Sequence, residues 1–309
     1  MNPVDLMVLS CDSISTLEEC ILAARKACSE YQGRSRIRVW DDNSSDESPN
    51  LAERMGCNVV RAPQRRGFPR SANEAIQGSD APWILLMNAD VLLGEDSLDP
   101  LLSCLNQDRV LAASPLSLLR DTKTLDMGRC TGRMERGWFR LHQDLWDRGT
   151  TGTLYASGGY MAIRRDIFLS LGGFDPIFSP GYWEDVDFCY RAWKRGWRTL
   201  FQPLSSVLHC KGQTFNVLYP KATLDELKAR NRFLFMWMNL SRPFLLQHLS
   251  WLPWKLAKAA VMRKKGFLRA FYGAGMLLSA ALPRRSRESS HWQLNDREIR
   301  NLLDPGSRT

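Results

Sequence analysis

The chain has 309 residues, of which 44% are hydrophobic and 24% are charged, a composition typical of a globular protein. These values exclude a disordered chain, and the length predicts one large domain with an appendage, or two domains. The net charge is +9, but residues 242–309 carry 13 of the 42 basic side chains and only 4 of the 33 acidic ones. The first 241 residues are therefore neutral overall, and we expect the basic tail to bind something anionic.

The eight cysteines form no CxxC pair and no Cys/His cluster with zinc-finger spacing. They favour free thiols in a reducing cytosol, and nothing at the N-terminus resembles a signal peptide. The longest apolar run of the tail, at 270–282, has 13 residues, whereas a membrane-spanning helix needs about 20. We therefore expect a cytoplasmic protein without a transmembrane span.

The first hundred residues alternate strand-like and helix-like segments. In chain order these segments are residues 4–10, 16–31, 37–40, 51–55, 58–61, 70–77 and 83–87. This alternation predicts an α/β fold with a mainly parallel sheet. Ligands bind such sheets beyond the carboxyl ends of the strands, so polar residues that directly follow the strands should converge there. These residues are Asp12, Asp41, Asp42, Asn88 and Asp90.

The segment 114–153 is polar, irregular and rich in glycine, and it predicts loops over the cleft. A strand is expected next over 156–163, followed by a short helix over 165–171. From about residue 224 the pattern is helical. Two prolines predict breaks in these last helices, Pro243 and Pro253.

A helix is also predicted over 184–195, because four apolar residues recur at helical spacing and Gly196 would end it. The four residues are Val186, Cys189, Tyr190 and Trp193. Glu184 and Asp185 occupy the first turn, away from that stripe. Acidic residues favour a helix start for stability alone, but two adjacent carboxylates exceed what a cap needs. One could be a general base, with its pKa raised by repulsion from its neighbour.

Three further groups of residues have both a functional and a structural interpretation. The carboxylates between Asp41 and Asp46 could accept hydrogen bonds from a nucleobase or ribose, or could only form a turn with a helix cap. Asn88 and Asp90 offer the oxygen ligands that Mg²⁺ or Mn²⁺ prefers beside a diphosphate, or they cap a turn. His209 could be a further metal ligand, although a lone histidine is more often structural.

The basic segment Arg65–Arg70 puts three arginines around Gly67 before a helix. Such a turn could cradle a phosphate, since guanidinium groups and helix N-termini both favour phosphate oxygens. The alternative is an exposed basic loop.

Taken together, and in their order along the chain, these segments resemble the family 2 inverting glycosyltransferases. Within that family they resemble the rhamnosyltransferase-like members that build bacterial surface polysaccharide. The match covers residues 4–240 and includes the short segments VWDDNSSD (39–46), RGFPRSAN (66–73) and LMNADV (86–91). The most specific block starts at Gly158-Gly159, continues through LGGFD (171–175) and ends with WEDVDFCYR (183–191).

The resemblance implies a glycosyltransferase type A (GT-A) fold, a Rossmann-like mixed sheet flanked by helices. It implies a catalytic domain at 1–225, followed by a C-terminal helical extension at 226–309. A nucleotide-diphosphate sugar is the implied donor, with a divalent cation (Mg²⁺ or Mn²⁺) as cofactor and a glycan or lipid-linked hydroxyl as acceptor. The sugar would move by a single displacement that inverts the anomeric configuration.

The resemblance also implies roles for individual residues. Asp185 is the implied catalytic base, with Glu184 as the alternate, and Asp90 and His209 are the implied metal ligands. The residues implied in donor binding are Asp12, Asp41, Asp42, Arg66, Gly67, Asn73, Asn88, Gly158 and Gly159.

The tail mixes aromatic and basic residues on interrupted helices, which is typical of an element that lies on anionic lipid. The alternative is a helical cap with a solvated basic face. The neutral body and the lack of a nucleic-acid-binding motif argue against nucleic acid as a partner. We therefore expect a peripheral protein on the inner face of the plasma membrane. A non-catalytic relative that binds a sugar nucleotide or scaffolds an assembly is the alternative function, because Asn88 weakens the metal motif.

Overall fold

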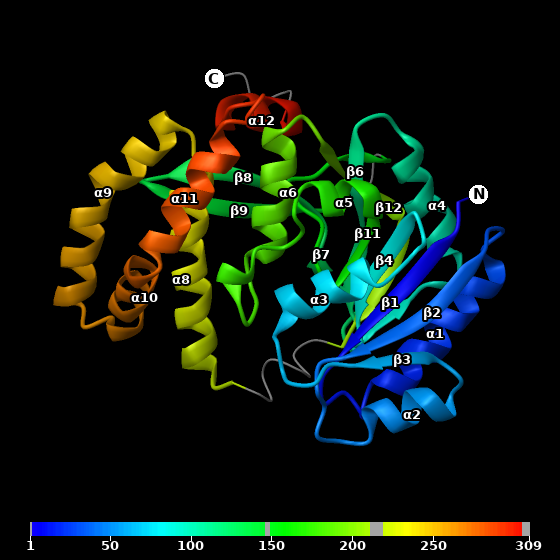
Figure 1. Ribbon diagram of the computed structural model, residues 1–309. Coiled ribbons are helices and arrows are strands. Elements are labelled where there is room, and N and C mark those ends of the chain that lie inside the picture. Colours follow the sequence, from blue (N-terminus) through cyan, green and yellow to red (C-terminus); the bar gives the residue numbers. More distant parts are fainter. Residues whose placement is uncertain (1, 146–148, 211–218, 305–309) are drawn as a thin grey trace.

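The computed structural model describes residues 2–145, 149–210 and 219–304 (Figure 1). Its centre is a ten-stranded mixed sheet with the order β10-β12-β6-β11-β4-β1-β2-β3, to which β5 adds beside β12 and β7 beside β6. The strands of this sheet are β1 (Val4–Ser10), β2 (Ser35–Asp41), β3 (Asn58–Arg61), β4 (Trp83–Asn88), β5 (Val91–Leu93), β6 (Val110–Leu119), β7 (Leu125–Met127), β10 (Thr151–Gly152), β11 (Tyr160–Arg164) and β12 (Arg198–His209). A separate two-stranded sheet pairs β8 (Arg129–Glu135) with β9 (Trp138–Asp144).

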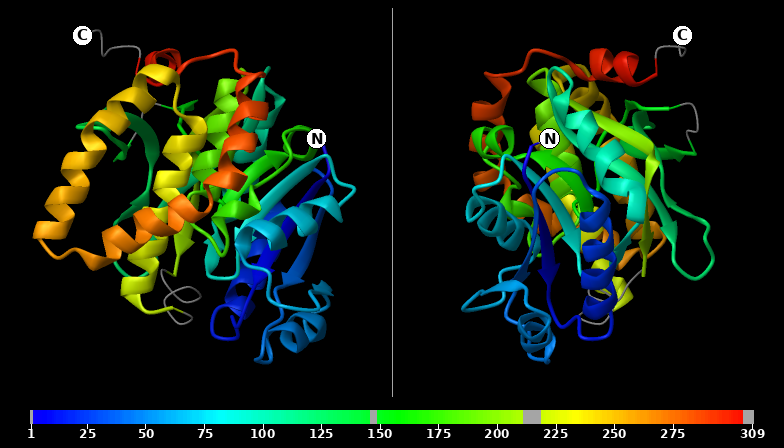
Figure 2. Two further views of the ribbon diagram at one scale, coloured as in Figure 1. Left: turned by 60° about the vertical axis from the view of Figure 1, so that its left-hand side comes forward. Right: turned by 90° about the vertical axis from the view of Figure 1, so that its right-hand side faces the viewer.

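Helices cover both faces of the large sheet, with α1 on one face and α3 on the other (Figures 1 and 2). The helices are α1 (Leu17–Glu30), α2 (Ser48–Arg54), α3 (Phe68–Gln77), α4 (Leu98–Ser103), α5 (Arg165–Ser170), α6 (Glu184–Lys194), α8 (Lys221–Asn239), α9 (Arg242–Val261), α10 (Lys265–Met276), α11 (Leu278–Ser289) and α12 (Asp296–Leu303). β1 and β4 are buried along almost their whole length, as their apolar sequences require for central strands. The α/β alternation predicted for the first hundred residues is confirmed.

The sheet is mixed because β11 runs antiparallel to its neighbours β4 and β6, while β1 pairs in parallel with β2 and β4. The expectation of loops over 114–153 is wrong, since that segment contains most of β6 and all of β7–β10. Its polar residues suggested exposed loops, but Ser114 and Ser117 are fully buried in β6. Its glycines also suggested loops, but some of them allow close packing within strands. A Cβ at Gly132 would lie 2.4 Å from the Phe139 ring.

Two further sequence expectations need correction. The break predicted at Pro243 is confirmed, since α8 ends at Asn239 and Pro243 lies in the first turn of α9, but Pro253 lies inside α9, which continues through it. In α6 the four apolar residues at helical spacing are buried as predicted, but the helix is buried almost all round. Glu184 is therefore only 6% exposed rather than on a solvated face.

The C-terminal helices pack on the body through α8. Phe233, Leu234, Phe235 and Met236 of α8 are fully buried and belong to the same apolar core as the sheet. α9 and α10 lie at the edge of the molecule, beyond α8 (Figure 1). The predicted boundary between residues 225 and 226 falls inside α8, and the division into two domains stays a prediction. Within the described ranges, no helix is both long and apolar enough to cross a membrane.

A buried ion pair joins the last helix, α12, to α6. The Lys194 ammonium group is fully buried and pairs with Asp296, which is 4% exposed. Asp296 also accepts hydrogen bonds from the Tyr190 hydroxyl at 2.8 Å and from the Ser241 backbone N–H at 2.7 Å. Removing one partner of such a pair leaves an uncompensated buried charge, which costs far more than the pair contributes.

We therefore expect Asp296→Ala to lower the free energy of unfolding by about 3–5 kcal/mol, because it leaves Lys194 buried without its counter-charge. Urea unfolding followed by circular dichroism measures this change. The exposed neighbour Arg297 gives a matched control, and Arg297→Ala should change stability by less than about 0.5 kcal/mol. Equal effects of the two substitutions would contradict the role of the pair.

Candidate active site

A cavity of about 720 Å³ lies beyond the carboxyl ends of β1, β2 and β4. These strands are adjacent and parallel, so that Ser10 of β1 lies opposite Asp41 and Leu9 lies opposite Asn88. The cavity sits where the strand order reverses direction around β1, the usual ligand position in such sheets. Of the residues predicted to converge at this edge, three line the cavity: Asp42, Asn88 and Asp90.

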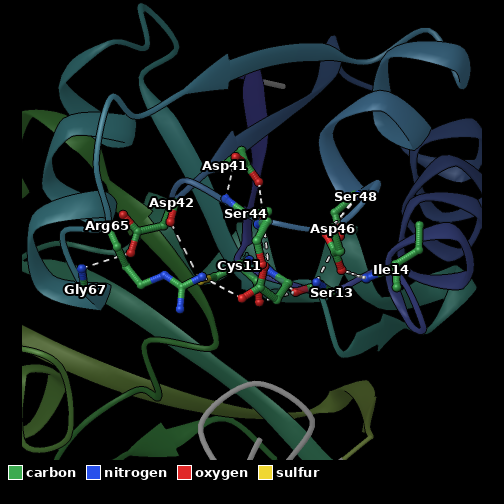
Figure 3. A network of polar contacts seen from close by, with 12 residues as sticks. Cys11, Ser13, Ile14, Asp41, Asp42, Ser44, Asp46, Ser48, Arg65 and Gly67 are labelled. Atoms are coloured by element: carbon green, nitrogen blue, oxygen red, sulfur yellow. Dashed lines mark hydrogen bonds and ion pairs between the residues drawn. The ribbon is translucent and has the colours of Figure 1, made fainter. Parts of the chain in front are cut away.

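Asp42 shapes the loop that carries the basic residues of the cavity (Figure 3). One carboxylate oxygen accepts the backbone N–H of Arg66 at 2.8 Å, and the other accepts that of Gly67 at 2.9 Å. Gly67 has a φ of +77°, and a Cβ there would lie 3.0 Å from the Cα of Pro180. Only glycine fits this position. The two hydrogen bonds to Asp42 hold the loop from which Arg65 and Arg66 line the cavity.

Asp12 and Asp41 were predicted to bind the donor, but the structure places both outside the cavity lining. Asp41 accepts hydrogen bonds from the backbone N–H of Ser44 at 3.0 Å and from the Ser44 hydroxyl at 2.5 Å (Figure 3). Asp12 accepts the backbone N–H of Ser45 at 2.7 Å and pairs with Arg65 at 2.5 Å. Partial burial alone would raise the pKa of Asp12, but these bonds lower it below its ordinary value. Both carboxylates bind the turn after β2. The structural interpretation of that turn predicted this for Asp41 but did not include Asp12.

Asn73 is also outside the lining, and its amide binds a neighbouring loop instead. It donates to the backbone carbonyl of Phe174 at 2.8 Å and accepts the N–H of the same residue at 2.9 Å. Asn88 and Gly159 do line the cavity and touch each other. A Cβ at Gly159 would lie 3.0 Å from Asn88 Nδ2, so glycine lets β11 approach the end of β4 closely.

Asp90 and His209 lie together on one wall of the cavity. Asp90 is 5% exposed, and its Oδ1 is buried with no hydrogen-bond partner among the described residues. His209 Nε2 is 3.6 Å from Asp90 Oδ2, and its Nδ1 is 2.9 Å from Asp126 Oδ2. A carboxylate on the far ring nitrogen is the usual way in which proteins orient a metal-binding histidine. The sequence did not point to Asp126, because its strand β7 lies in the segment expected to form loops.

The charge state of His209 depends on these two carboxylates. Burial alone would lower the pKa of His209, but the hydrogen bonds to Asp126 and Asp90 raise it to about 9. A cation bound at Asp90 would displace this proton. Among the described residues, no three His, Cys, Asp or Glu side chains could hold a metal ion by themselves. A cation here would need phosphate oxygens or water to complete its shell, which is how Mg²⁺ commonly binds.

Glu184 and Asp185 face the same cavity from the start of α6. Trp183 caps the helix in the left-handed region, with a φ of +74°. Asp185 accepts the backbone N–H of Gly158 at 3.1 Å and that of Val186 at 2.8 Å. Gly158, predicted to bind the donor, is therefore placed to orient Asp185 instead, and it is not part of the lining.

The two carboxyl groups differ in charge state. Burial raises the pKa of Asp185 to about 6, and backbone N–H groups oppose a further rise. Burial and then repulsion from Asp185 raise the pKa of Glu184 well above its usual range, and its Oε2 has no hydrogen-bond partner among the described residues. The predicted repulsion thus acts mainly on Glu184. Asp185 is the member of the pair that is ionised near neutral pH.

The third acid of this helix, Asp187, is fully buried and serves the structure. It pairs with Arg191 at 2.8 Å and accepts the Asn239 amide at 2.7 Å. Asn231 of α8 holds the backbone that leads into α6. Its Nδ2 lies 2.9 Å, 2.9 Å and 2.7 Å from the carbonyl oxygens of Phe178, Gly181 and Tyr182 respectively.

The mixed sheet with this cavity at its carboxyl edge is the fold of a GT-A glycosyltransferase. The chain belongs to glycosyl transferase family 2, whose family model matches residues 6–172. It is 29% identical over 209 residues to N-acetylglucosaminyl-diphospho-decaprenol L-rhamnosyltransferase from Mycobacterium tuberculosis, covering 58% of this chain and 67% of that protein. It is 26% identical over 170 residues to human N-acetylgalactosaminyltransferase 7, covering 49% of this chain but only 26% of that protein.

Solved structures support the same fold. A mannosyltransferase from Pyrobaculum calidifontis in complex with GDP-Man and Mn²⁺ superposes with a TM-score of 0.59 at 17% identity, covering 93% of this chain and 83% of that one. GalNAc-T7 with UDP, GalNAc and Mn²⁺ also gives 0.59, at 16% identity, covering 79% of this chain and 49% of that one. The GT-A fold inferred from the sequence motifs is confirmed.

The raised pKa of Asp185 predicts how activity depends on pH. If Asp185 must be ionised to accept a proton, kcat/KM should be constant near pH 7.5 and fall about tenfold per pH unit below about pH 6. Initial rates between pH 5 and 8 measure this limb, with circular dichroism as a control for folding. A profile that falls only near pH 4 would contradict the assignment.

Proposed function

We propose that this protein transfers a sugar from a nucleotide-diphosphate sugar to an acceptor hydroxyl, with Asp185 as the general base and Asp90 as a cation ligand. One observation carries the proposal: Asp42, Asp90 and Asp185, which are far apart in sequence, line one cavity. Its volume of about 720 Å³ suits a ligand of nucleotide-sugar size.

The donor would occupy the part of the cavity at the ends of β1, β2 and β4. Arg65 and Arg66 stand there on the loop held by Asp42, where their guanidinium groups can meet the diphosphate. The buried Nε of Arg66 has no hydrogen-bond partner among the described residues, although its Nη1 pairs with Glu74 at 2.9 Å. A phosphate oxygen would satisfy that donor.

The residues at Asp90 fit a divalent cation. The unpartnered Oδ1 of Asp90 is a free oxygen ligand, and Asp126 can hold His209 with Nε2 toward the same place. When bound, Mg²⁺ or Mn²⁺ would stabilise the negative charge that develops on the departing nucleoside diphosphate. The Mn²⁺ in the two solved GT-A structures supports this choice of ion.

Asp185 would take the proton of the acceptor hydroxyl as its oxygen attacks the anomeric carbon from the face opposite the diphosphate. The bond to the diphosphate breaks in the same step, so the configuration inverts. The N–H groups of Gly158 and Val186 hold the carboxylate in place. They also oppose the rise of its pKa that burial causes, which favours the ionised form that a base needs.

The amide variant Asp185→Asn tests this role. It should lower turnover by roughly 10²–10⁴-fold, the contribution of general-base catalysis, while donor affinity stays within about twofold. The assay is nucleoside diphosphate release from a panel of UDP-, GDP- and dTDP-sugars with extracted bacterial lipids and Mn²⁺. Calorimetric titration gives donor affinity.

Two variants complete that experiment. Glu184→Gln should keep most of the activity, because Glu184 is not the proposed base and its raised pKa favours the neutral form that glutamine mimics. Asp90→Asn should abolish the part of donor binding that Mn²⁺ strengthens. Near-normal turnover by Asp185→Asn would reject Asp185 as the base, and donor binding without any turnover by the wild type would favour the non-catalytic alternative.

We also propose that α9 and α10 lie on an anionic membrane surface, where a lipid-linked acceptor would be found. Large apolar side chains are exposed on these helices, including Val261 at 84%, Tyr272 at 68% and Met276 at 64%. The turn between the helices carries three consecutive exposed cations, residues 263–265. Exposed apolar residues beside cations suit an interface with anionic lipid. The acceptor in the name of the mycobacterial relative, a diphospho-decaprenol, is consistent with such a location.

Vesicle sedimentation tests the membrane proposal. Val261→Ser combined with Met262→Ser should weaken binding to phosphatidylglycerol vesicles at least about tenfold, since each buried apolar side chain contributes about 1.5–3 kcal/mol. High salt should weaken binding of the wild type further. Leu204→Ser, at a position 77% exposed on β12, serves as the matched control and should bind like the wild type. Equal binding by all three proteins would refute the proposal.

A further inference from the structure

A second cavity of about 650 Å³ adjoins the active-site cavity, and Trp183 and Lys228 line both. We propose that this second cavity binds the phosphate groups of the acceptor, and that the acceptor is therefore a sugar joined through a diphosphate to a lipid. This inference rests on the proposed transferase function and adds the chemical class of its acceptor.

The charge of the second cavity is strongly positive. One carboxylate, Asp225, is part of its lining. Six cationic side chains line the same cavity and come from β9, α8, α9 and the turn before α10. They are Arg140, Lys228, Arg232, Lys255, Lys258 and Lys264. A cavity with this balance favours a ligand that carries two or more negative charges.

Most of these cations have no counter-charge among the residues that the structure describes. Arg140 pairs with Glu135 at 3.0 Å, whereas the described residues bring no carboxylate within 4.0 Å of the other five. Aromatic faces hold several of them in place instead. The Arg232 guanidinium lies 5.0 Å from the Trp138 ring and 5.4 Å from the Trp183 ring, and Lys255 lies 5.6 Å from Trp138. Cation–π contacts orient a positive group without neutralising it.

The cations also repel one another. Burial lowers the pKa of Arg232 to about 9, and the nearby Arg140 adds to the effect. Burial likewise lowers the pKa of Lys255, with repulsion from Arg140 and Arg232 next. A structure that keeps like charges together at this cost is stabilised when an anion binds between them. Phosphate groups supply that anion with the oxygen acceptors that guanidinium and ammonium groups need.

The position of the cavity connects it with the acceptor rather than with the donor. Trp183 directly precedes the pair Glu184-Asp185, and Lys228 comes from α8, so the shared wall lies on the side of the base. The donor side, by contrast, is lined by Arg65 and Arg66. A ligand across the shared wall would have its sugar hydroxyl at Asp185 and its phosphates among the cations.

The aromatic part of the lining suits an apolar group attached to the phosphates. Trp254 is 52% exposed and lines the cavity, as does Phe267 of α10. These side chains belong to the helices that expose Val261 and Tyr272. An apolar chain attached to the diphosphate would leave the cavity along this face.

Calorimetric titration with two probes, inorganic pyrophosphate and geranyl diphosphate, tests the site in EDTA and without lipid. Lys255→Gln combined with Lys258→Gln should weaken geranyl diphosphate binding at least about tenfold, because two charge-assisted contacts are lost. The control removes the same charge from exposed tail positions, Arg287→Gln with Arg297→Gln, and should bind within about twofold of the wild type. Equal affinity of the cavity variant and the wild type would overturn the proposal.

The two probes separate a lipid from a free anion. Geranyl diphosphate should bind at least about threefold more tightly than pyrophosphate, because its chain contacts Trp254 and Phe267. Equal affinities of the wild type for the two probes would overturn the lipid assignment.

Turnover assays keep this inference separate from the transferase proposal. With a lipid-diphosphate sugar as acceptor, the cavity variant should raise the acceptor KM at least about tenfold and leave donor KM and kcat within about threefold. An unchanged acceptor KM would count against the site. Asp185→Asn should still bind geranyl diphosphate like the wild type. Cavity-dependent binding of geranyl diphosphate without any sugar transfer by the wild type would refute the transferase function but uphold the anion site.

Discussion

The candidate active site depends on two adjacent carboxyl groups at the start of α6, the buried Glu184 and the half-buried Asp185, and no cation among the described residues forms an ion pair with either. A cationic side chain in contact with Asp185 would keep it ionised, but it would also lower the pKa of Asp185 and make it a weaker base. Backbone N–H groups from Gly158 and Val186 give a milder compensation, so its pKa settles at about 6. Such an arrangement requires a rigid backbone, and Asn231 supplies it through the carbonyls before the helix.

The other buried charges of α6 differ from this pair, because they form ion pairs that stabilise the structure. Asp187 and Lys194 lie on the same helix and are fully buried, but each has an opposite charge in contact, Arg191 and Asp296 respectively. The charges of α6 that face the protein are thus paired, whereas Glu184 and Asp185, which face the cavity, form no ion pair within the described ranges. Because Asn231 and Asp296 belong to the last third of the chain, the C-terminal helices help to position α6, which carries the proposed base, rather than only covering it.

The sequence predicted the N-terminal half of the sheet because its strands and helices alternate and each carries its own local pattern. It could not predict β6–β10, since buried serines such as Ser117 and close-packed glycines such as Gly132 look like loop residues until their neighbours are known. The same limit applies to the site. Asp12, Asp41 and Asp42 all directly follow predicted strands, and only the tertiary structure shows that, of these three, Asp42 alone lines the cavity. Asp126 could not be identified as a site residue from the sequence, because only the fold brings it next to His209.

The chain is neutral before residue 242 and basic after it. This uneven charge agrees with different ways of binding the two proposed anions, the donor diphosphate and the acceptor diphosphate. If both substrates bind as proposed, the donor diphosphate needs little net charge from the body, because a cation at Asp90 and the arginines of one loop meet it. The acceptor diphosphate has no such cation, so fixed positive charge must come from the protein. Lys255 and Lys258 would supply it within the second cavity, while the exposed Arg263 and Lys265 would remain available to lipid headgroups. One basic tail can thereby hold the head of an acceptor and the membrane in which its chain is anchored, with the reacting hydroxyl beside Asp185.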